Sequence, residues 1–385
     1  MSIVRHFVLA AGGTGGHMMP AHALAAELMA RGHKVALITD ARGAKIPGLF
    51  EGVETHLLPA GRITGNPMSW PGGIRAILGG RSMARKLFKE FKPSVVIGFG
   101  GYPAFPALVA AQGMGIPTAV HEQNAVLGRV NRMVARRVTA IATSYPEIDR
   151  LPAKYAEKVH LVGNPVRDDI VALRDQPYPH LEREGVFRIL VIGGSQGASV
   201  LSDVVPHALS ALPPVLRCNL QVTQQCRAED IEEVRQRYTG FGIPADLGTY
   251  IDNIPETLSW THLVIARAGA STIAELTAAG RPAILIPLPN ATDDHQTANV
   301  REMVAAGGAR MIRQSAFTPG ELCKQMQKLA LKPQGLLLAA EGAKSCGRPH
   351  ATRDLANLLE QLGRPPVVDG IRVDGYPTGA LGASS

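Results

Sequence analysis

Polar side chains that can bind a nucleotide follow a short apolar run at residues 263–266, whose length suits a buried strand. After a turn of small residues, Ser271 or Thr272 can cap a helix, which Gly280 can end. Such a helix start presents free backbone N–H groups and the positive end of the helix dipole, so it can hold a diphosphate without a basic cluster. Glu275, in the first helical turn, can accept two hydrogen bonds from a vicinal diol such as a ribose. The alternative is that Glu275 only complements the helix dipole.

A glycine-rich turn, GGTGGH at 12–17, is a second candidate site. It joins an apolar strand at 7–11 to a helix expected from about residue 20 to 31. The turn lacks the Lys-Ser/Thr pair of a P-loop, and the third glycine of a dinucleotide fingerprint would fall at Met18. Four glycines still allow close approach to the backbone, which favours a phosphate or pyrophosphate ligand over a purely structural turn. His17 is a candidate general base, because imidazole takes up a proton near neutral pH.

Polar residues also follow other expected strands. Asp40 ends a strand at 34–39 and favours a dinucleotide site, because an acidic residue there can hold a ribose. Glu122 follows an apolar run at 118–121 and is the second candidate for a general base. Ligands of open α/β sheets bind at the carboxyl ends of the strands, so these polar residues are expected at one edge of a sheet.

The strand-turn-helix pattern occurs in both halves of the chain, which predicts an α/β protein of two Rossmann-like domains facing a central cleft. RILVIGGSQGA at 188–198 repeats the pattern of FVLAAGGTGGH at 7–17. A length of 385 residues also favours two domains over one core. The predicted parts are an N-terminal domain (1–162), a linker (163–186), a C-terminal domain (187–348), a helix (349–362) and a disordered tail (363–385).

The amino-acid composition limits which classes of protein and which partners are possible. Hydrophobic residues make up 45% of the chain, as in a globular enzyme, and the net charge of +8 suits nucleic acid, an anionic membrane or phosphorylated ligands. The four cysteines form no C-x-x-C pair, so neither a disulfide framework nor a metal site is expected. The sequence has no signal-peptide pattern and no apolar run approaching about 18 residues, which predicts a cytoplasmic protein with only peripheral membrane contact.

A basic segment at 70–92 is the candidate for that contact. Ile74, Ile77 and Leu78 share helical spacing, and arginines and lysines surround and follow them. A helix of this kind can lie on an anionic membrane surface, or it can be an ordinary surface helix. Nucleic acid is not expected as a partner, because the basic residues lack interleaved aromatic side chains.

Seven motifs occur in order along the chain: GGTGGH (12–17), GFGGYPAFP (98–106), HEQNAVLGRVN (121–131), GNPVR (163–167), GGSQGA (193–198), YIDN (250–253) and ARAGASTIAELTAAGRPAILIP (266–287) with DDHQTAN after it. Together they resemble the peptidoglycan N-acetylglucosaminyltransferases of glycosyltransferase family 28, which have the GT-B fold. The resemblance implies inverting transfer of N-acetylglucosamine from UDP-N-acetylglucosamine to the 4-hydroxyl of undecaprenyl-pyrophosphoryl-MurNAc-pentapeptide (lipid I). The product would be lipid II, made without a cofactor at the cytoplasmic face of the inner membrane.

The resemblance also implies which residues bind the substrates. Ile251 would contact the uracil, Glu275 the ribose and Gln296 the sugar hydroxyls. The implied binding residues are Thr14, Gly15, Gly16, Asn124, Arg167, Ser195, Ile251, Ala270, Ser271, Thr272, Ile273, Ala274, Glu275 and Gln296. The turn at 100–106 departs from the family pattern, since Ala104 and Phe105 replace a serine and a glycine.

Inverting transfer needs a base for the acceptor hydroxyl and stabilisation of the departing UDP. The helix start near Ala270, together with Arg167, can stabilise the UDP without a metal. The pair Asp293-Asp294 resembles a metal-binding carboxylate pair, but we interpret it as a loop cap. His17 is preferred over Glu122 as the base, because it lies beside the turn where an acceptor pyrophosphate would bind.

Three other functions remain open. They are a GT-B epimerase acting on UDP-N-acetylglucosamine, a dinucleotide oxidoreductase and a nucleotide-sugar-binding protein without catalysis. The basic apolar segment favours a lipid acceptor over the epimerase, and the incomplete fingerprint disfavours the oxidoreductase.

Overall fold

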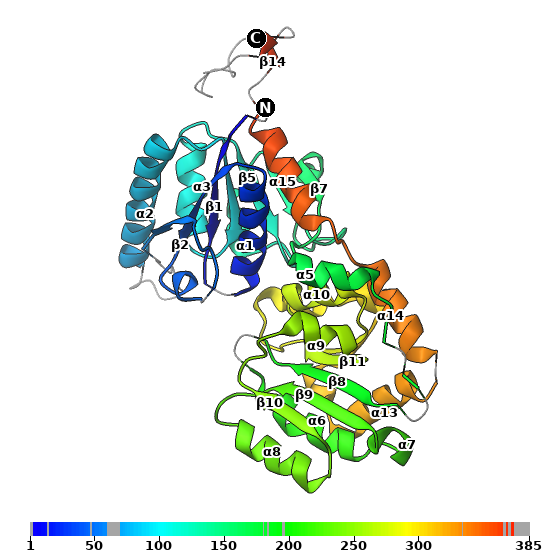
Figure 1. The fold of residues 1–385 in the computed structure, drawn as a ribbon. Helices are drawn as coiled ribbons and strands as arrows, with labels where there is room; N and C mark the ends of the chain where they lie inside the picture. The colour runs from blue at the N-terminus through cyan, green and yellow to red at the C-terminus, as the bar shows by residue number, and fades with distance from the viewer. Residues whose placement is uncertain are drawn as a thin grey trace. The chain divides into compact units, whose positions relative to one another are not determined.

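The chain forms two compact α/β units (Figure 1). The computed structural model describes residues 3–13, 15–46, 48–59, 70–179, 181–182, 185–194, 197–332, 334–364, 367–368 and 371–372. The first unit contains Met1–Pro165 and His350–Ser385, and the second contains Val166–Pro349. The α/β class and the two Rossmann-like halves expected from the sequence are confirmed.

The first unit is built on a seven-stranded parallel sheet in the order β3-β2-β1-β4-β5-β6-β7. The strands are β1 (His6–Ala11), β2 (Lys34–Thr39), β3 (Glu54–Leu57), β4 (Val95–Gly100), β5 (Thr118–Glu122), β6 (Ala140–Thr143) and β7 (Val159–Leu161). β4 and β5 are buried along their whole length, as expected for parallel strands covered on both faces. Since all strands run the same way, the loops after β1, β4 and β5 emerge at one edge of the sheet.

Helices cover both faces of this sheet. They are α1 (Gly15–Ala30), α2 (Trp70–Phe91), α3 (Ala104–Gln112), α4 (Arg129–Val134) and α15 (Ala351–Leu362). α1 and α15 add Leu24 and Leu359 to the buried cluster on one face. α2 and α3 add Phe88 and Leu108 to the cluster on the other face.

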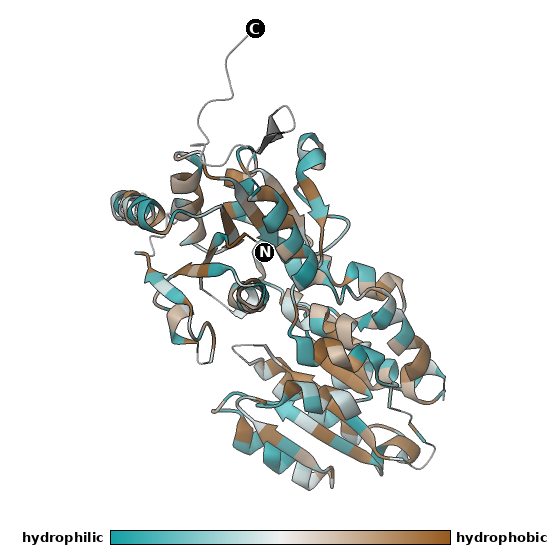
Figure 2. Ribbon diagram, turned by 45° about the horizontal axis from the view of Figure 1, so that its top comes forward, coloured by the Kyte–Doolittle hydropathy of each residue, from teal (hydrophilic) through white to brown (hydrophobic). Residues whose placement is uncertain are grey.

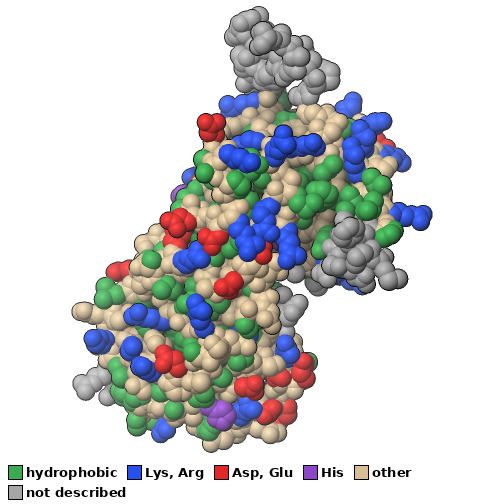
Figure 3. Space-filling view, turned by 180° about the vertical axis from the view of Figure 1, so that it is seen from behind, with side chains coloured by type: hydrophobic (Ala, Val, Ile, Leu, Met, Phe, Trp, Pro, Cys, Tyr) green, Lys and Arg blue, Asp and Glu red, His purple; other side chains and the backbone are tan. Residues whose placement is uncertain are grey.

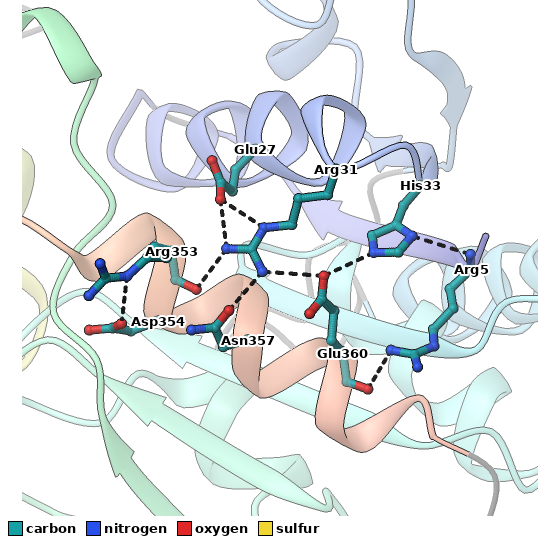
Figure 4. Close-up of polar contacts among 8 residues, drawn as sticks. All are labelled: Arg5, Glu27, Arg31, His33, Arg353, Asp354, Asn357 and Glu360. Carbon is teal, nitrogen blue, oxygen red and sulfur yellow. Dashed lines mark hydrogen bonds and ion pairs between the residues drawn. The ribbon is translucent and has the colours of Figure 1, made fainter. Parts of the chain in front are cut away.

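A polar network fastens α15 to this unit, although α15 follows the second unit in the chain (Figure 4). The Glu360 carboxylate lies 3.2 Å from Arg31 Nη1 and 3.0 Å from His33 Nε2. Arg31 also pairs with Glu27 at 2.6 Å and donates to Asn357 Oδ1 at 2.7 Å. Partial burial raises the pKa of Glu360, but hydrogen bonds from His33 and Arg31 outweigh it and hold that pKa below its usual value. The predicted helix at 349–362 is thus part of the first unit.

The second unit has a six-stranded parallel sheet in the order β10-β9-β8-β11-β12-β13. The strands are β8 (Phe187–Ile192), β9 (Leu220–Gln225), β10 (Ala245–Gly248), β11 (Leu263–Arg267), β12 (Ala283–Ile286) and β13 (Ala309–Met311). The helices that matter for the site and the core are α5 (Asp168–Val171), α6 (Ser199–Ser210), α8 (Ile231–Gly240), α9 (Ile254–Trp260), α10 (Ala270–Ala279), α11 (His295–Asn299), α13 (Pro319–Ala330) and α14 (Gly335–Ser345). Brown apolar residues fill much of the strands of both units, and the helices alternate teal and brown (Figure 2).

Two segments differ from the sequence-based expectation. The stretch 163–186, treated as a linker, contains α5 and a 3-10 turn, Ala172–Asp175, both packed against α10. α1 begins at Gly15 rather than near residue 20, so His17 lies in a helix and not in the turn. Within the described ranges, no helix has the length and apolar character needed to cross a membrane.

Candidate active site

The helix α10 begins directly after β11, at the carboxyl edge of the second sheet. Its N-cap is Gly269, with φ −67° and ψ 144°, and no side chain caps it. The expectation that Ser271 or Thr272 would cap the helix was wrong, because the extended Gly269 places both residues in the first turn. Glu275 is accordingly in the second turn. The helix ends at Gly280 as predicted, in a left-handed conformation with φ 65°.

Glu275 has an unusual environment for a carboxylate. It is half-buried, and among the described residues no hydrogen bond or ion pair reaches it. Burial raises the pKa of Glu275 to about 7; the positive charge of Arg167 acts against this shift, and Asp169 adds to it. Since no described residue donates a hydrogen bond to this carboxylate, its oxygens are available to the hydroxyl groups of a ligand.

Two further polar atoms, on α5 and α10, lack a hydrogen-bond partner in the described structure. Arg167 is the N-cap of α5, which packs on α10. Its Nε is buried without a hydrogen bond in the described structure and lies 3.9 Å from the nearest Asp169 oxygen. Ser271 Oγ, in the first turn of α10, is also buried and unpaired. The first two turns of α10 and the N-terminus of α5 therefore offer a cation, a hydroxyl and a carboxylate to a ligand.

The same edge of the sheet carries the other residues expected to bind the donor. Ile251 lines a cavity of about 380 Å³ together with Asp246 and Trp260. Gln296, on α11, accepts a hydrogen bond from the Leu288 backbone at 2.9 Å through its Oε1, which leaves its amide nitrogen as a donor. Ala270, Ile273 and Ala274 lie on the first two turns of α10.

The pair Asp293-Asp294 precedes α11. Both residues have positive φ, 58° and 53°. Asp294 occupies the N-cap position of α11 and accepts a hydrogen bond from Thr297 Oγ1 at 2.7 Å. Among the described residues, no three His, Cys, Asp or Glu side chains are close enough to hold a metal ion together.

In the first unit, the glycine turn after β1 and the glycine turn after β4 are in contact at the carboxyl edge of the sheet. A Cβ on Gly101 would lie 2.6 Å from the Gly12 carbonyl oxygen, so only glycine allows this contact. His17, in the first turn of α1, lies between the turns: its Nδ1 is 2.9 Å from the Gly12 oxygen. A Cβ on Gly100 would lie 3.0 Å from its Nε2. Gly15 and Gly16 begin α1.

Glu122 is buried and fully used by the protein. Its Oε2 accepts hydrogen bonds from the Gly128 backbone at 2.7 Å and from Asn131 Nδ2 at 2.8 Å. Its Oε1 accepts from the backbone and the side chain of Asn124, at 3.1 and 3.3 Å. The carboxylate therefore organises the loop that carries Asn124.

Asp40 is also occupied. Its Oδ1 accepts backbone hydrogen bonds from Gly13, Arg42 and Gly43, and its Oδ2 pairs with Arg42 Nη2 at 3.1 Å. The interpretation of Asp40 as a ribose ligand was wrong, because these donors saturate a carboxylate that is only 1% exposed.

Thr14 and Ser195 lie outside the described residues. Of the other expected site residues, His17, Glu122 and Asn124 belong to the first unit with Gly15 and Gly16, and the rest belong to the second. Arg42, which lies against the glycine turn, was not predicted as a site residue; the only signal in the sequence is its position two residues after Asp40.

The fold is that of a GT-B glycosyltransferase: it has two parallel Rossmann-like sheets, and unpaired polar side chains lie at a helix start in the second unit. The chain belongs to glycosyltransferase family 28: the family's N-terminal domain model matches residues 7–143 and its C-terminal domain model matches residues 188–359.

The chain is similar over its whole length to enzymes named UDP-N-acetylglucosamine–N-acetylmuramyl-(pentapeptide) pyrophosphoryl-undecaprenol N-acetylglucosamine transferase. The Novosphingobium aromaticivorans enzyme is 61% identical, with 99% of this chain and 98% of the relative covered. The Brucella abortus enzyme is 43% identical, with 96% and 97% covered. The crystal structure of Acinetobacter baumannii MurG is 29% identical, with a TM-score of 0.74 and with 93% of this chain and 99% of that chain covered.

A UDP-N-acetylglucosamine 2-epimerase from Neisseria meningitidis shares the fold. It is 14% identical, with a TM-score of 0.64 over 92% of this chain and all of that chain. At this identity the likeness shows the fold alone.

Proposed function

We propose that this protein transfers N-acetylglucosamine from UDP-N-acetylglucosamine to the 4-hydroxyl of lipid I, giving lipid II with inversion at the anomeric carbon. The observation that carries the proposal is the 61% identity, across 99% of the chain, to a relative named for this transfer. The unpaired polar atoms around α10 support it independently, because a nucleotide diphosphate sugar supplies partners for each of them.

On the donor side, the diphosphate lies against the start of α10, where the backbone N–H groups and the helix dipole favour an anion. The Arg167 guanidinium adds a positive charge, which stabilises the UDP as the glycosidic bond to phosphate breaks. Glu275 accepts hydrogen bonds from the ribose hydroxyls. Gln296 donates to the sugar through its amide nitrogen.

On the acceptor side, His17 takes the proton of the attacking hydroxyl. The Gly12 carbonyl can only accept a hydrogen bond, so His17 carries its proton on Nδ1 and presents a bare Nε2 lone pair. This is the tautomer that a general base needs. Glu122 has its oxygens occupied by four hydrogen bonds and positions the loop that carries Asn124.

Membrane contact through α2 brings the enzyme to its lipid acceptor at the cytoplasmic face. Ile74, Leu78 and Met83 are 49%, 57% and 50% exposed on this helix. Figure 3 shows Lys and Arg side chains interspersed with hydrophobic ones on the first unit. Apolar insertion and attraction to anionic lipids then act together.

A turnover assay with UDP-N-acetylglucosamine and a lipid I analogue tests the activity. The expected products are UDP and a disaccharide with a β linkage. Formation of UDP-N-acetylmannosamine would instead identify an epimerase, and tight UDP-N-acetylglucosamine binding without turnover would identify a binding protein.

Flotation with liposomes containing anionic lipids tests the membrane surface. Replacing Ile77 and Leu78 by Asp should weaken binding, and added salt should weaken binding of the unchanged protein. The control is Leu338→Asp, because Leu338 is 62% exposed on α14 of the second unit. Equal losses in the variant and the control would reject α2 as the contact surface.

A further inference from the structure

A guanidinium lies against the glycine turn of the first unit. Arg42 Nη2 is 3.1 Å from the position that a Cβ on Gly13 would occupy. Gly13 has a φ of +88°, a backbone conformation that residues with a side chain rarely adopt. Glycine at this position therefore permits the turn and also leaves room for the arginine. The side chain of Arg42 is 55% exposed, so the guanidinium is accessible to a ligand at the turn.

Asp40 holds this arginine in place. The carboxylate accepts backbone hydrogen bonds from Gly13 at 3.2 Å and from Gly43 at 2.8 Å, and it pairs with Arg42 Nη2. Burial raises the pKa of Asp40, but these backbone bonds and the guanidinium outweigh it and lower that pKa, so the group stays ionised. One buried carboxylate therefore fixes both the glycine turn and the guanidinium, and it engages only one edge of the guanidinium fork.

Besides the Arg42 guanidinium, a helix start contributes positive potential at the turn. α1 is a helix of 16 residues that begins at Gly15, directly after the turn, so its dipole adds positive potential there. The negative charge of Asp40 is buried and compensated by its own hydrogen bonds, whereas the guanidinium faces solvent. A dianionic group at the turn would meet a preorganised arginine and a helix start together, with His17 in the first turn of that helix.

We propose that Arg42 binds the diphosphate of the acceptor substrate. This assignment rests on the proposed function and adds a residue to it. The remaining N–H groups of the guanidinium donate to the phosphate oxygens, which arginine suits better than lysine because its planar fork can bind two oxygens at once. No bond to phosphorus forms or breaks, so Arg42 acts in binding and orientation and not in proton transfer.

The test compares two acceptor analogues, one with the natural diphosphate and one with a single phosphate in its place. For wild type, kcat/KM should be higher on the diphosphate acceptor. Arg42→Gln should lower kcat/KM on the diphosphate acceptor about tenfold or more, mainly through KM, and should change the monophosphate value much less. Inorganic pyrophosphate should inhibit wild type in competition with the acceptor, and Arg42→Gln should weaken that inhibition.

The controls separate binding from folding. Lys45→Gln removes the same charge from the adjoining short helix, Gly43–Lys45, and should leave both acceptors unaffected. Arg42→Lys should recover part of the loss, and UDP affinity should stay at the wild-type value in all three variants.

Equal losses on both acceptors, or a loss accompanied by weaker UDP binding, would make Arg42 only a structural partner of Asp40. An unchanged kcat/KM on the diphosphate acceptor would reject the assignment outright. If wild type transfers no sugar to either acceptor, the proposed function fails. Calorimetry then still decides the assignment, because Arg42→Gln should bind pyrophosphate more weakly than wild type if Arg42 holds a diphosphate, and equally if it does not.

Discussion

Glu122 in the first unit and Glu275 in the second are both glutamates near the carboxyl edge of a parallel sheet, yet their surroundings are opposite. Glu122 is 2% exposed and accepts four hydrogen bonds from Asn124, Gly128 and Asn131. Glu275 accepts none from the described residues, and burial raises its pKa to about 7.

We infer from this difference that Glu122 has a structural role and that Glu275 binds a ligand. A carboxylate satisfied by the protein stabilises its loop and has no lone pair to spare for chemistry. A partly buried carboxylate to which no protein group donates is poorly solvated, and its oxygens stay available to the hydroxyl groups of a ligand. Four experiments can break or sharpen this distinction.

The largest effect on kcat is expected at His17, because the hydrogen bonds of Glu122 leave His17 as the preferred candidate for the base. His17→Ala should lower kcat about a hundredfold or more, with UDP affinity close to wild type. Steady-state kinetics and calorimetry measure the two quantities. In Glu122→Gln, the folded enzyme should keep kcat within about tenfold of wild type. A larger loss in Glu122→Gln than in His17→Ala would return the role of base to Glu122.

Glu122→Ala should destabilise the protein by about 2 kcal/mol, since it leaves the buried Asn131 amide and the Gly128 N–H without their acceptor. Denaturant unfolding with and without the substitution measures the loss. Glu275→Ala is the matched control, and it should cost less because no hydrogen bond is broken. Equal losses in the two variants would contradict the division into structural and ligand-binding carboxylates.

Glu275→Ala should weaken binding of UDP and of UDP-N-acetylglucosamine by a similar factor, about tenfold, because both ligands carry the same ribose. Gln296→Ala should weaken only the sugar nucleotide. Calorimetric titration of both variants with both ligands gives the four values. Wild-type UDP affinity in Glu275→Ala would make Glu275 a residue that only complements the helix dipole.

The pH dependence of UDP binding should be a smaller effect, but one that is specific to Glu275. In wild type, UDP affinity should rise between about pH 6 and 8 as Glu275 ionises with its pKa of about 7, whereas Glu275→Gln should lack this component. The contribution of Glu275 to the free energy of unfolding should change in the opposite direction, falling as the pH rises. The folded protein holds the Glu275 proton more tightly than the unfolded chain, so this group's contribution is complete below about pH 4.5 and is lost as the pH rises through 7.

Thermal unfolding of both proteins across this range measures the stability effect. Glu275→Gln should gain stability relative to wild type as the pH rises. A stability difference that does not vary with pH would mean that Glu275 titrates normally.

The sequence by itself determined several strands, the end of one helix and the family. β2 runs over the predicted residues, because a short apolar run between polar turns is stable as a buried strand of a covered parallel sheet. Gly280 ends its helix as predicted, because a left-handed residue there favours glycine. These are local properties of the chain, and the ordered motifs added the GT-B class.

Only the tertiary structure decided what each polar side chain does. In the sequence, Asp40 was a ribose ligand only under the disfavoured dinucleotide interpretation, whereas Glu275 was one at the expected nucleotide helix. Three backbone N–H groups and Arg42 occupy the Asp40 carboxylate, and no described residue donates a hydrogen bond to Glu275. Arg42 reaches Gly13 across a separation of many residues because β1 and β2 are adjacent in the sheet. Hydrogen-bond satisfaction depends on donors brought together by folding, and for that reason apolar periodicity cannot predict it.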